Sequence, residues 1–274
     1  MGQELRQLPQ RDGFDYIFTD VNELDICDKE ATFHFVEQNR IDLIINCAAY
    51  TDVERAEVER ERAEQINVEG VANLASAARE YNATLIHIST DYVFGGIATH
   101  SPITEEQICA PLGVYGETKW RGEEAVIASG CNYIIIRTSW LYSIYGKNFV
   151  KTILKLSESK DSISVVNDQI GSPTYAADLA QTIVCLVESG KIEANGGIYH
   201  YSNKGAISWF DFAQRIVILS GNKCDVKPCT SVEFGSKVKR PSYSVLDTSK
   251  VCDRFGIDVP EWEKSLEICI SKMN

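Results

Sequence analysis

The chain has 274 residues and a formal net charge of −12, with 44% hydrophobic and 24% charged residues. This length is long for one core and short for two independent domains. The negative charge argues against nucleic acid or an anionic membrane as the main partner, because both are bound through clustered Lys and Arg. No apolar run approaches the roughly 20 residues that span a bilayer. The nine cysteines form no Cys-x-x-Cys pair, so we expect reduced thiols in a cytoplasmic protein.

Short apolar runs alternate with helical patterns in the first half of the chain. The predicted strands are residues 16–18, 43–46, 85–88 and 133–136, and the predicted helices are residues 28–39, 62–81 and 115–129. Strands this apolar are typical of a parallel sheet that helices cover on both faces. The alternation therefore predicts a Rossmann-type, doubly wound α/β fold.

The pattern changes after about residue 145. Loops rich in Gly, Asn, Ser and Pro separate four further predicted helices, at residues 148–158, 175–189, 208–220 and 260–272. We predict a dinucleotide-binding domain over residues 1–144. Residues 145–274 are predicted to form a smaller substrate lobe, interleaved with the last strands of the sheet.

Tyr115 and Lys119 are the sharpest chemical signal. Four residues apart on a helix, the two side chains share one face. A phenol has a pKa near 10. An ammonium about 4 Å away, at an effective dielectric near 20, supplies about 4 kcal/mol, enough to bring that pKa towards neutrality. The spacing predicts an acid–base pair, and the alternative is a solvated helix face, because Tyr-x-x-x-Lys occurs by chance in many helices.

Two of the predicted strands end in residues suited to a ligand. Ligands of doubly wound sheets bind beyond the carboxyl ends of the strands. There the Thr90 hydroxyl can hydrogen-bond a substrate carbonyl oxygen, while the small Ala48 and Ala49 let a cofactor lie close to the backbone. The alternative for the two alanines is packing between a helix and a strand.

Five motifs follow one another along the chain. They are Asn-x-Ala-Ala-x-Thr (46–51), Ser-Thr-Asp-Tyr-Val-Phe (89–94), Tyr-Gly-Glu-Thr-Lys (115–119), Arg-Thr-Ser-Trp (137–140) and Asn-Asp-Gln-x-Gly-x-Pro-Thr (167–174). With them the chain resembles the dTDP-4-dehydrorhamnose reductase family of extended short-chain dehydrogenases/reductases over nearly its whole length. The resemblance implies reduction of the 4-keto group of a dTDP-linked 6-deoxyhexose with NADPH or NADH, forming dTDP-L-rhamnose.

The resemblance also implies residue roles. Thr90 would polarise the keto oxygen, Tyr115 would protonate it, and Lys119 would hold the nicotinamide ribose and lower the Tyr115 pKa. The implied substrate contacts are Asp91 and Trp140 to the sugar, the loop residues Asn167, Asp168 and Gln169, and Arg240 to the diphosphate. Three of these have structural alternatives: a core aromatic for Trp140, a turn cap for Asp168 and an ordinary surface arginine for Arg240.

On the cofactor side the implied contacts are Gly2, Asp20, Asp25, Ile26, Ala48, Ala49, Thr51, Tyr115 and Lys119. An acid at the position of Asp20 commonly accepts a hydrogen bond from the ribose 2′-hydroxyl and disfavours a 2′-phosphate, which favours NADH or the use of both cofactors. Glu4 matches a magnesium-binding glutamate of some family members. A single glutamate does not make a site, so we predict no metal.

The resemblance fails at the N-terminus. The family begins with a strand and a Gly-x-x-Gly-x-x-Gly turn, of which only Gly2, the last glycine, has a match. We therefore expect that Met1 is not the natural start. We also expect the sheet to lack its first strand and to show a gap or distorted pairing, and these 274 residues to bind nicotinamide cofactor weakly.

Two other functions stay open. One is a different nucleotide-sugar activity on the same scaffold, such as an epimerase or a dehydratase. The other is a non-catalytic regulatory subunit, which the missing glycines favour and the intact Thr90, Tyr115 and Lys119 oppose. The expected partner is a dTDP-sugar, without nucleic acid or membrane, and a homodimer is possible.

Overall fold

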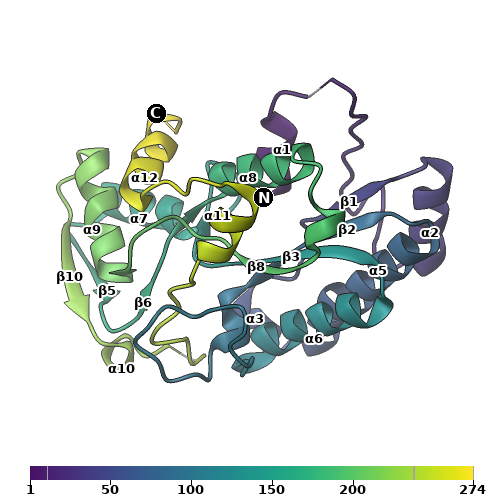
Figure 1. Cartoon of the computed structure of the whole chain (residues 1–274). Helices are drawn as coiled ribbons and strands as arrows, with labels where there is room; N and C mark the ends of the chain where they lie inside the picture. Colours follow the sequence, from purple (N-terminus) through teal and green to yellow (C-terminus); the bar gives the residue numbers. More distant parts are fainter. Residues whose placement is uncertain (11, 237, 274) are drawn as a thin grey trace.

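A four-stranded parallel sheet forms the centre of the molecule (Figure 1). The structure is a computed structural model that describes residues 1–10, 12–236 and 238–273. The strands of the sheet, in spatial order, are β1 (Leu43–Asn46), β2 (Thr84–Thr90), β3 (Asn132–Thr138) and β8 (Gly197–His200). All their carboxyl ends therefore meet at one edge.

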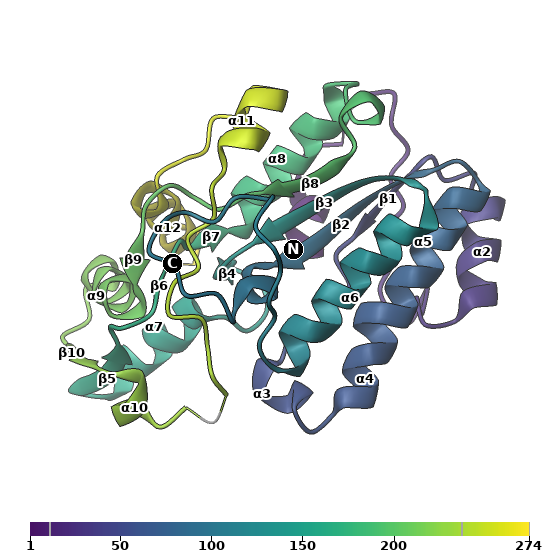
Figure 2. The same ribbon diagram turned by 60° about the horizontal axis from the view of Figure 1, so that its bottom comes forward.

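Helices cover both faces of this sheet (Figures 1 and 2). One face carries α2 (Lys29–Gln38), α5 (Val71–Glu80) and α6 (Gly113–Ser129), and the other carries α1 (Gly2–Gln7), α8 (Ala176–Glu188) and α11 (Ser249–Phe255). Alternate residues of a strand point to opposite faces. Accordingly Leu85 packs in the core under α5 and α6, whereas Ile86 packs under α8 and α11. The predicted doubly wound fold is confirmed.

A second hydrophobic core lies beside the sheet. Its elements are α7 (Phe149–Ser159), β5 (Ser162–Val166), α9 (Trp209–Ser220), β10 (Asp225–Cys229) and α12 (Trp262–Ser271). The short α10 (Ser231–Phe234) follows β10 and has no buried residue. β5 and β10 pair in parallel, and Phe212 and Leu266 are fully buried between these elements. By contrast, β8 is a strand of the central sheet, and α8 and α11 pack on that sheet. The second half of the chain therefore contributes to both cores.

The remaining elements are short. They are α3 (Val53–Ala56), α4 (Arg60–Glu64), the π-helical η1 (Gln65–Gly70), the 3₁₀-helical η2 (Asp91–Phe94) and η3 (Glu193–Asn195), and the two-residue strands β4 (Leu141–Tyr142), β6 (Ile170–Gly171), β7 (Thr174–Tyr175) and β9 (Ile207–Ser208). Strand β4 pairs with β7 in parallel, and β6 pairs with β9 antiparallel.

The predicted strand at residues 16–18 is wrong, because this segment has no regular structure. Its aromatic rings contact one another instead: Tyr16 lies 6.3 Å from Phe14 and 6.1 Å from Phe18 between ring centroids. Within the described residues β1 is an edge strand that pairs only with β2, in regular parallel register. The four strands are contiguous, so the expected gap or distorted pairing is not seen in this sheet. Most other predicted elements are found within a few residues, whereas β5, β8, β10 and α11 were not predicted.

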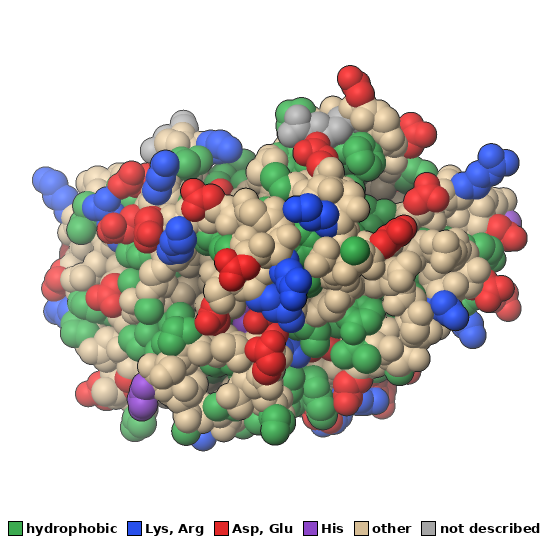
Figure 3. All heavy atoms as spheres, in the orientation of Figure 1, with side chains coloured by type: hydrophobic (Ala, Val, Ile, Leu, Met, Phe, Trp, Pro, Cys, Tyr) green, Lys and Arg blue, Asp and Glu red, His purple; other side chains and the backbone are tan. Residues whose placement is uncertain are grey.

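Charged side chains of both signs are interspersed on the face shown in Figure 3. None of the helices in the described ranges combines the length and the apolar character needed to cross a membrane.

Candidate active site

The carboxyl end of β2 places Thr90 and Asp91 together in the interior. Thr90 Oγ1 donates to Asp91 Oδ1 at 3.0 Å and accepts from the backbone N–H of Tyr92 at 3.2 Å, which begins η2. Asp91 is only 3% exposed. Burial raises the pKa of Asp91 to about 6, although hydrogen bonds from Ser244 and Thr90 oppose the rise. A buried carboxyl group thus adjoins a buried hydroxyl at the carboxyl end of β2.

Tyr115 reaches the same place from the first turns of α6. Its side chain hydrogen-bonds Thr90, and its ring meets Tyr92 edge to face at 5.3 Å between centroids. Burial raises the pKa of Tyr115 well above its usual range, with the contact to Thr90 opposing and Asp91 adding to the rise. The predicted lowering of this pKa by Lys119 is wrong in this structure. The phenol is held in its protonated form.

Lys119 lies on the same helix but points at β2. It is 2% exposed, and its Nζ donates to the carbonyl oxygen of Ile88 at 2.8 Å and lies 3.2 Å from Nε2 of His87. Burial lowers the pKa of Lys119 to about 8, whereas Glu123 and Cys47 favour the ammonium. The expected pair of Tyr115 and Lys119 therefore shares a helix, with the two side chains engaged by different groups.

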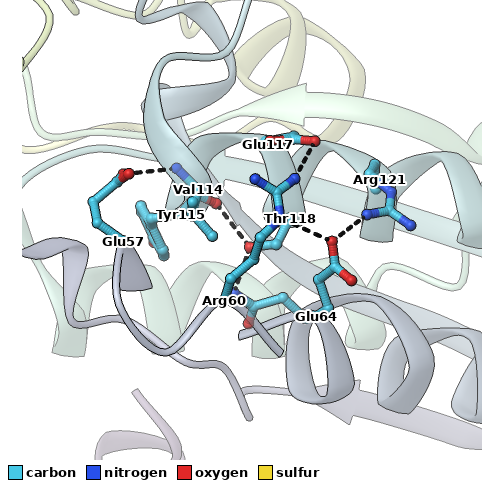
Figure 4. A network of polar contacts seen from close by, with 9 residues as sticks. Glu57, Arg60, Glu64, Val114, Tyr115, Glu117, Thr118 and Arg121 are labelled. Carbon is cyan, nitrogen blue, oxygen red and sulfur yellow. Dashed lines mark hydrogen bonds and ion pairs between the residues drawn. The ribbon is translucent and has the colours of Figure 1, made fainter. Parts of the chain in front are cut away.

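Polar contacts fix the first turns of α6 against α3 and α4 (Figure 4). Glu57 accepts from the backbone N–H of Val114 at 2.8 Å, directly before Tyr115. Arg60 contacts Glu117 at 2.8 Å, and Arg121 contacts Glu64 at 2.7 Å. The two glycines of α6 allow close packing, because a Cβ would lie 2.6 Å from the Tyr92 carbonyl oxygen at Gly116 and 2.2 Å from that of Asn67 at Gly122. These contacts set where Tyr115 stands.

Small residues follow β1 at the same edge. The chain turns there because Asn46 Oδ1 accepts from the backbone N–H of Ala48 at 3.0 Å. Ala48 and Thr51 are exposed and Ala49 is half-buried, while a Cβ on Gly2 would lie 3.8 Å from Cβ of Cys47. The open backbone beside Lys119 and Thr90 fits a flat cofactor lying across the strand ends.

The predicted adenine-side residues differ in their surroundings. Asp20 is exposed, and its Oδ1 accepts only from the next backbone N–H, so the carboxylate remains accessible. Asp25 accepts from the N–H of Cys27 at 2.9 Å. Ile26 packs in the core under α5, where a Cβ on Gly70 would lie 2.7 Å from its Cγ1. Its position supports a structural role more directly than a ligand contact.

Trp140 lies where β3 leads into the second core. Its backbone is in the left-handed region (φ 47°), which is uncommon for a bulky residue and is frequent at functional sites. Its indole stacks on Trp209. Trp140 is partly buried and packs against the second core. This position is compatible with a core aromatic and with a substrate contact.

The loop before β6 is directed largely to α10. Asp168 accepts from the backbone N–H of Ser231 at 2.9 Å and from its hydroxyl at 2.6 Å, as expected of a turn cap. The side chain of Gln169 is buried and donates to Ser231 Oγ at 2.9 Å, while Asn167 is exposed. Of these three side chains, Asn167 is the one without a hydrogen bond to Ser231 among the described residues.

Arg240 stands close to the Thr90–Tyr115 cluster. It lowers the pKa of Tyr92, the residue in edge-to-face contact with Tyr115, and its Nη2 lies 3.6 Å from Glu54. Its Nε is buried without a hydrogen bond. The Arg240 side chain is nevertheless 36% exposed, so only part of the guanidinium is withdrawn from solvent.

Sequence reasoning missed the polar side chains beneath the site. His87 and Ser89 point from β2 towards α6, where His87 meets Lys119 and Ser89 hydrogen-bonds Glu123. The buried Glu123 also accepts from Arg137 Nη2 at 2.6 Å. Alternation along residues 85–90 is the signal that could have found them, because two polar residues share the face occupied by Leu85.

Comparison with known proteins agrees with this geometry. The protein family described as RmlD substrate binding domain matches residues 1–274. The dTDP-4-dehydrorhamnose reductase of Aggregatibacter actinomycetemcomitans is 38% identical over 97% of this chain and 94% of its own length. The chain belongs to the dTDP-4-dehydrorhamnose reductase family.

Solved structures of the same family share the whole fold. The Bacillus anthracis str. Ames dTDP-4-dehydrorhamnose reductase, in complex with NADP, superimposes with a TM-score of 0.93 at 39% identity, covering 99% of this chain and 95% of its own. The Clostridium acetobutylicum enzyme gives 0.93 at 40% identity with the same coverage. The fold predicted from the alternation of strands and helices is confirmed, and NADPH or NADH is the cofactor class.

No group of three or more His, Cys, Asp or Glu residues suited to a metal occurs in the part of the chain that the structure describes. Glu4 is 5% exposed and accepts from the hydroxyl of Ser143 at 2.6 Å. This contact ties α1 to the segment that follows β4.

Proposed function

We propose that this protein reduces the 4-keto group of dTDP-4-dehydro-6-deoxy-L-mannose to give dTDP-L-rhamnose, with NADPH or NADH. The observation that carries the proposal is the cluster of the buried Thr90 and Asp91 with the partly buried Tyr115 at the carboxyl end of β2. It occurs in a chain that matches dTDP-4-dehydrorhamnose reductases over almost their full length.

In this proposal each residue of the cluster has a separate task. The nicotinamide, when bound, supplies the hydride. The Thr90 hydroxyl hydrogen-bonds the keto oxygen, and Tyr115 delivers a proton to it as the alkoxide forms. The raised pKa of Tyr115 suits this task, because the phenol stays protonated until the more basic alkoxide develops. Asp91 orients the sugar from its buried position.

We assign the remaining predicted contacts in the same way. Lys119 holds the nicotinamide ribose, and the chain at Gly2, Ala48, Ala49 and Thr51 lies against the cofactor. Asp20 reaches the adenosine ribose, with Asp25 and Ile26 nearby. The lobe built on β5 and β10 binds the dTDP-sugar, with Trp140, Asn167 and Gln169 on its side of the site and Arg240 at the diphosphate.

The reaction is tested by following the absorbance of the reduced nicotinamide with purified protein and dTDP-4-dehydro-6-deoxy-L-mannose. We expect consumption of the reduced cofactor only when the sugar is present, with dTDP-L-rhamnose identified as the product by NMR. Conversion of the sugar without net oxidation of the cofactor would instead indicate an epimerase or a dehydratase. Cofactor and sugar binding without turnover would indicate a regulatory subunit.

We also propose that the protein acts in the cytoplasm and forms a homodimer. The first proposal rests on the nine cysteines, all free thiols within the described residues, as is usual in a reducing compartment. Sedimentation velocity tests the second, and a single species at the monomer mass would contradict it.

A further inference from the structure

The parallel register of β1 and β2 places two polar side chains side by side below the site. Asn46 is the registered partner of His87. The Asn46 Nδ2 atom lies 3.1 Å from His87 Nδ1, and His87 Nε2 lies 3.2 Å from Lys119 Nζ. All three residues are at most 4% exposed. They form a chain of contacts from which water is excluded.

The hydrogen bond that Asn46 accepts determines which atoms donate and which accept in the contacts of His87. The backbone N–H of Ala48 donates to Asn46 Oδ1 at 3.0 Å, which fixes the amide with its Nδ2 towards His87. An amide nitrogen can only donate, so His87 Nδ1 must be the acceptor and carries no proton. A neutral imidazole then holds its single proton on Nε2, which faces Lys119.

An N–H group that faces Lys119 distinguishes between its two protonation states. An ammonium has no acceptor, so the protonated side chain and the imidazole present hydrogens to each other. The neutral amine accepts from His87 Nε2–H while it still donates to the Ile88 carbonyl oxygen. The contact is a hydrogen bond only after the lysine has lost its proton.

We propose that His87, oriented by Asn46, is a positioning residue that stabilises the neutral amine of Lys119 and thereby makes the Lys119 ammonium a readier proton donor. The proposal rests on the reductase function argued above. In that reaction Tyr115 loses its proton in each turnover, and Lys119, one helical turn away, is the group on the same helix that can part with one near neutral pH.

The electrostatics around Lys119 agree with the geometry. Burial is the main cause that lowers the pKa of Lys119 to about 8. Burial and the nearby Lys119 also hold the pKa of His87 well below its usual value, so the imidazole stays neutral. The other groups that face Lys119 are Cys47, from the segment after β1, and Glu123, from its own helix, and both favour the ammonium. Glu123 is itself held by Ser89 and Arg137.

NMR of the whole protein tests the proposal without any assay. The ¹⁵N shifts of His87 should show the proton on Nε2. The ¹³Cε signal of Lys119, identified by its loss in Lys119→Met, should titrate near pH 8. In His87→Gln the amide can turn its oxygen to the ammonium, so the titration should move upward by about one pH unit. The matched control is His200→Gln, because His200 is equally buried but contacts Ile103 instead; it should leave Lys119 unchanged.

A second variant tests the same proposal if His87→Gln does not fold. Asn46→Asp presents an oxygen to His87 Nδ1, so the imidazole proton should move to Nδ1 and the Lys119 titration should again rise. In the kinetic arm, the alkaline limb of kcat/KM should shift upward with the NMR titration. A proton on Nδ1 in the wild type, or the same Lys119 titration in His87→Gln, would overturn the proposal. Absent turnover with the NMR results as expected would reject only the reductase function.

Discussion

The indole of Trp140 lies flat against that of Trp209, with the ring centroids 3.5 Å apart and the planes 9° from parallel. Gly171 leaves the space that this arrangement needs, because a Cβ there would lie 2.5 Å from Cε2 of Trp140. Trp140, which we propose contacts the sugar, is thus held by the ring of Trp209 and by the absence of a side chain at Gly171.

Gly171→Ala is expected to displace the Trp140 ring and to raise the KM for the dTDP-sugar more than it lowers kcat. Overpacking costs about 1–3 kcal/mol, so a rise in KM of roughly tenfold is expected. Steady-state kinetics measures it, with Trp209→Phe as the milder comparison that keeps a ring. An unchanged KM in a folded Gly171→Ala protein would show that Trp140 does not contact the sugar.

Tyr115→Phe is expected to lower kcat by about 10²–10⁴, the usual contribution of a general acid, with little change in substrate KM. Single-turnover and steady-state assays measure both quantities. Tyr133→Phe, at the amino end of β3 and away from the carboxyl ends of the strands, is the control and should keep its activity. Near-normal turnover by Tyr115→Phe would remove the acid from the mechanism.

Asp20→Ser is expected to improve NADPH relative to NADH, because the carboxylate no longer repels a 2′-phosphate. Loss of about 1.4 kcal/mol of repulsion corresponds to about a tenfold change in the ratio of kcat/KM for the two cofactors. Asp15→Ser removes an exposed charge from the same segment and should leave the ratio as it is. The same ratio in both variants would mean that Asp20 does not reach the ribose.

Asp91→Asn is expected to stabilise the protein at neutral pH while it impairs activity. The pKa of about 6 in the folded protein lies above the ordinary aspartate value of 3.8, so the native state binds this proton more tightly than the unfolded state does. The stability that Asp91 contributes is therefore present below pH 3.8 and is lost as the pH rises through about 6. Two pKa units correspond to about 3 kcal/mol.

Urea unfolding of both proteins across this pH range measures the difference. The free energy of unfolding should be higher for Asp91→Asn at pH 7, and the gap should close as the pH falls towards 3.8, the pKa of an unperturbed aspartate. A gap that does not depend on pH would mean that the charge on Asp91 is not the cause.

Gly122→Ala is expected to destabilise the fold, although alanine normally favours a helix over glycine by about 1 kcal/mol. The new Cβ would lie 2.2 Å from the backbone carbonyl oxygen of Asn67, and a backbone neighbour cannot move aside cheaply. A loss of about 1–3 kcal/mol in the free energy of unfolding is expected. Glu124→Ala, exposed on the same helix, should stay within about 0.5 kcal/mol.

Periodicity in the sequence was sufficient to predict the central sheet and most of its helices. It failed at residues 16–18, because an apolar run forms a strand only when a partner strand lies beside it. It also missed β8, which is one of the four strands of the sheet. The sequence Gly197-Ile-Tyr-His200 is too short to stand out from the loop around it.

The motifs identified Thr90, Asp91 and Tyr115 as one site, and the structure brings them together. Local spacing did not reveal what Lys119 touches. Helical spacing places Tyr115 and Lys119 on one face, but their partners come from β2, far away in the sequence. The same limit applies to Asp168 and Gln169, whose partner Ser231 is more than sixty residues away.

The register of strand β2 determines both which of its residues lie below the site and which pack in the core. Its odd-numbered residues His87 and Ser89 contact Lys119 and Glu123, respectively. Its even-numbered residues Ile86 and Ile88 pack under α8 and α11. A shift of one residue exchanges the two faces of a strand. The insertion or deletion of one residue in β2 would therefore bury the wrong set on both sides at once. Substitutions in β2 change one side chain, whereas a change in its length changes both faces. Among related chains we therefore expect the number of residues in β2 to vary less than the identity of any one of them.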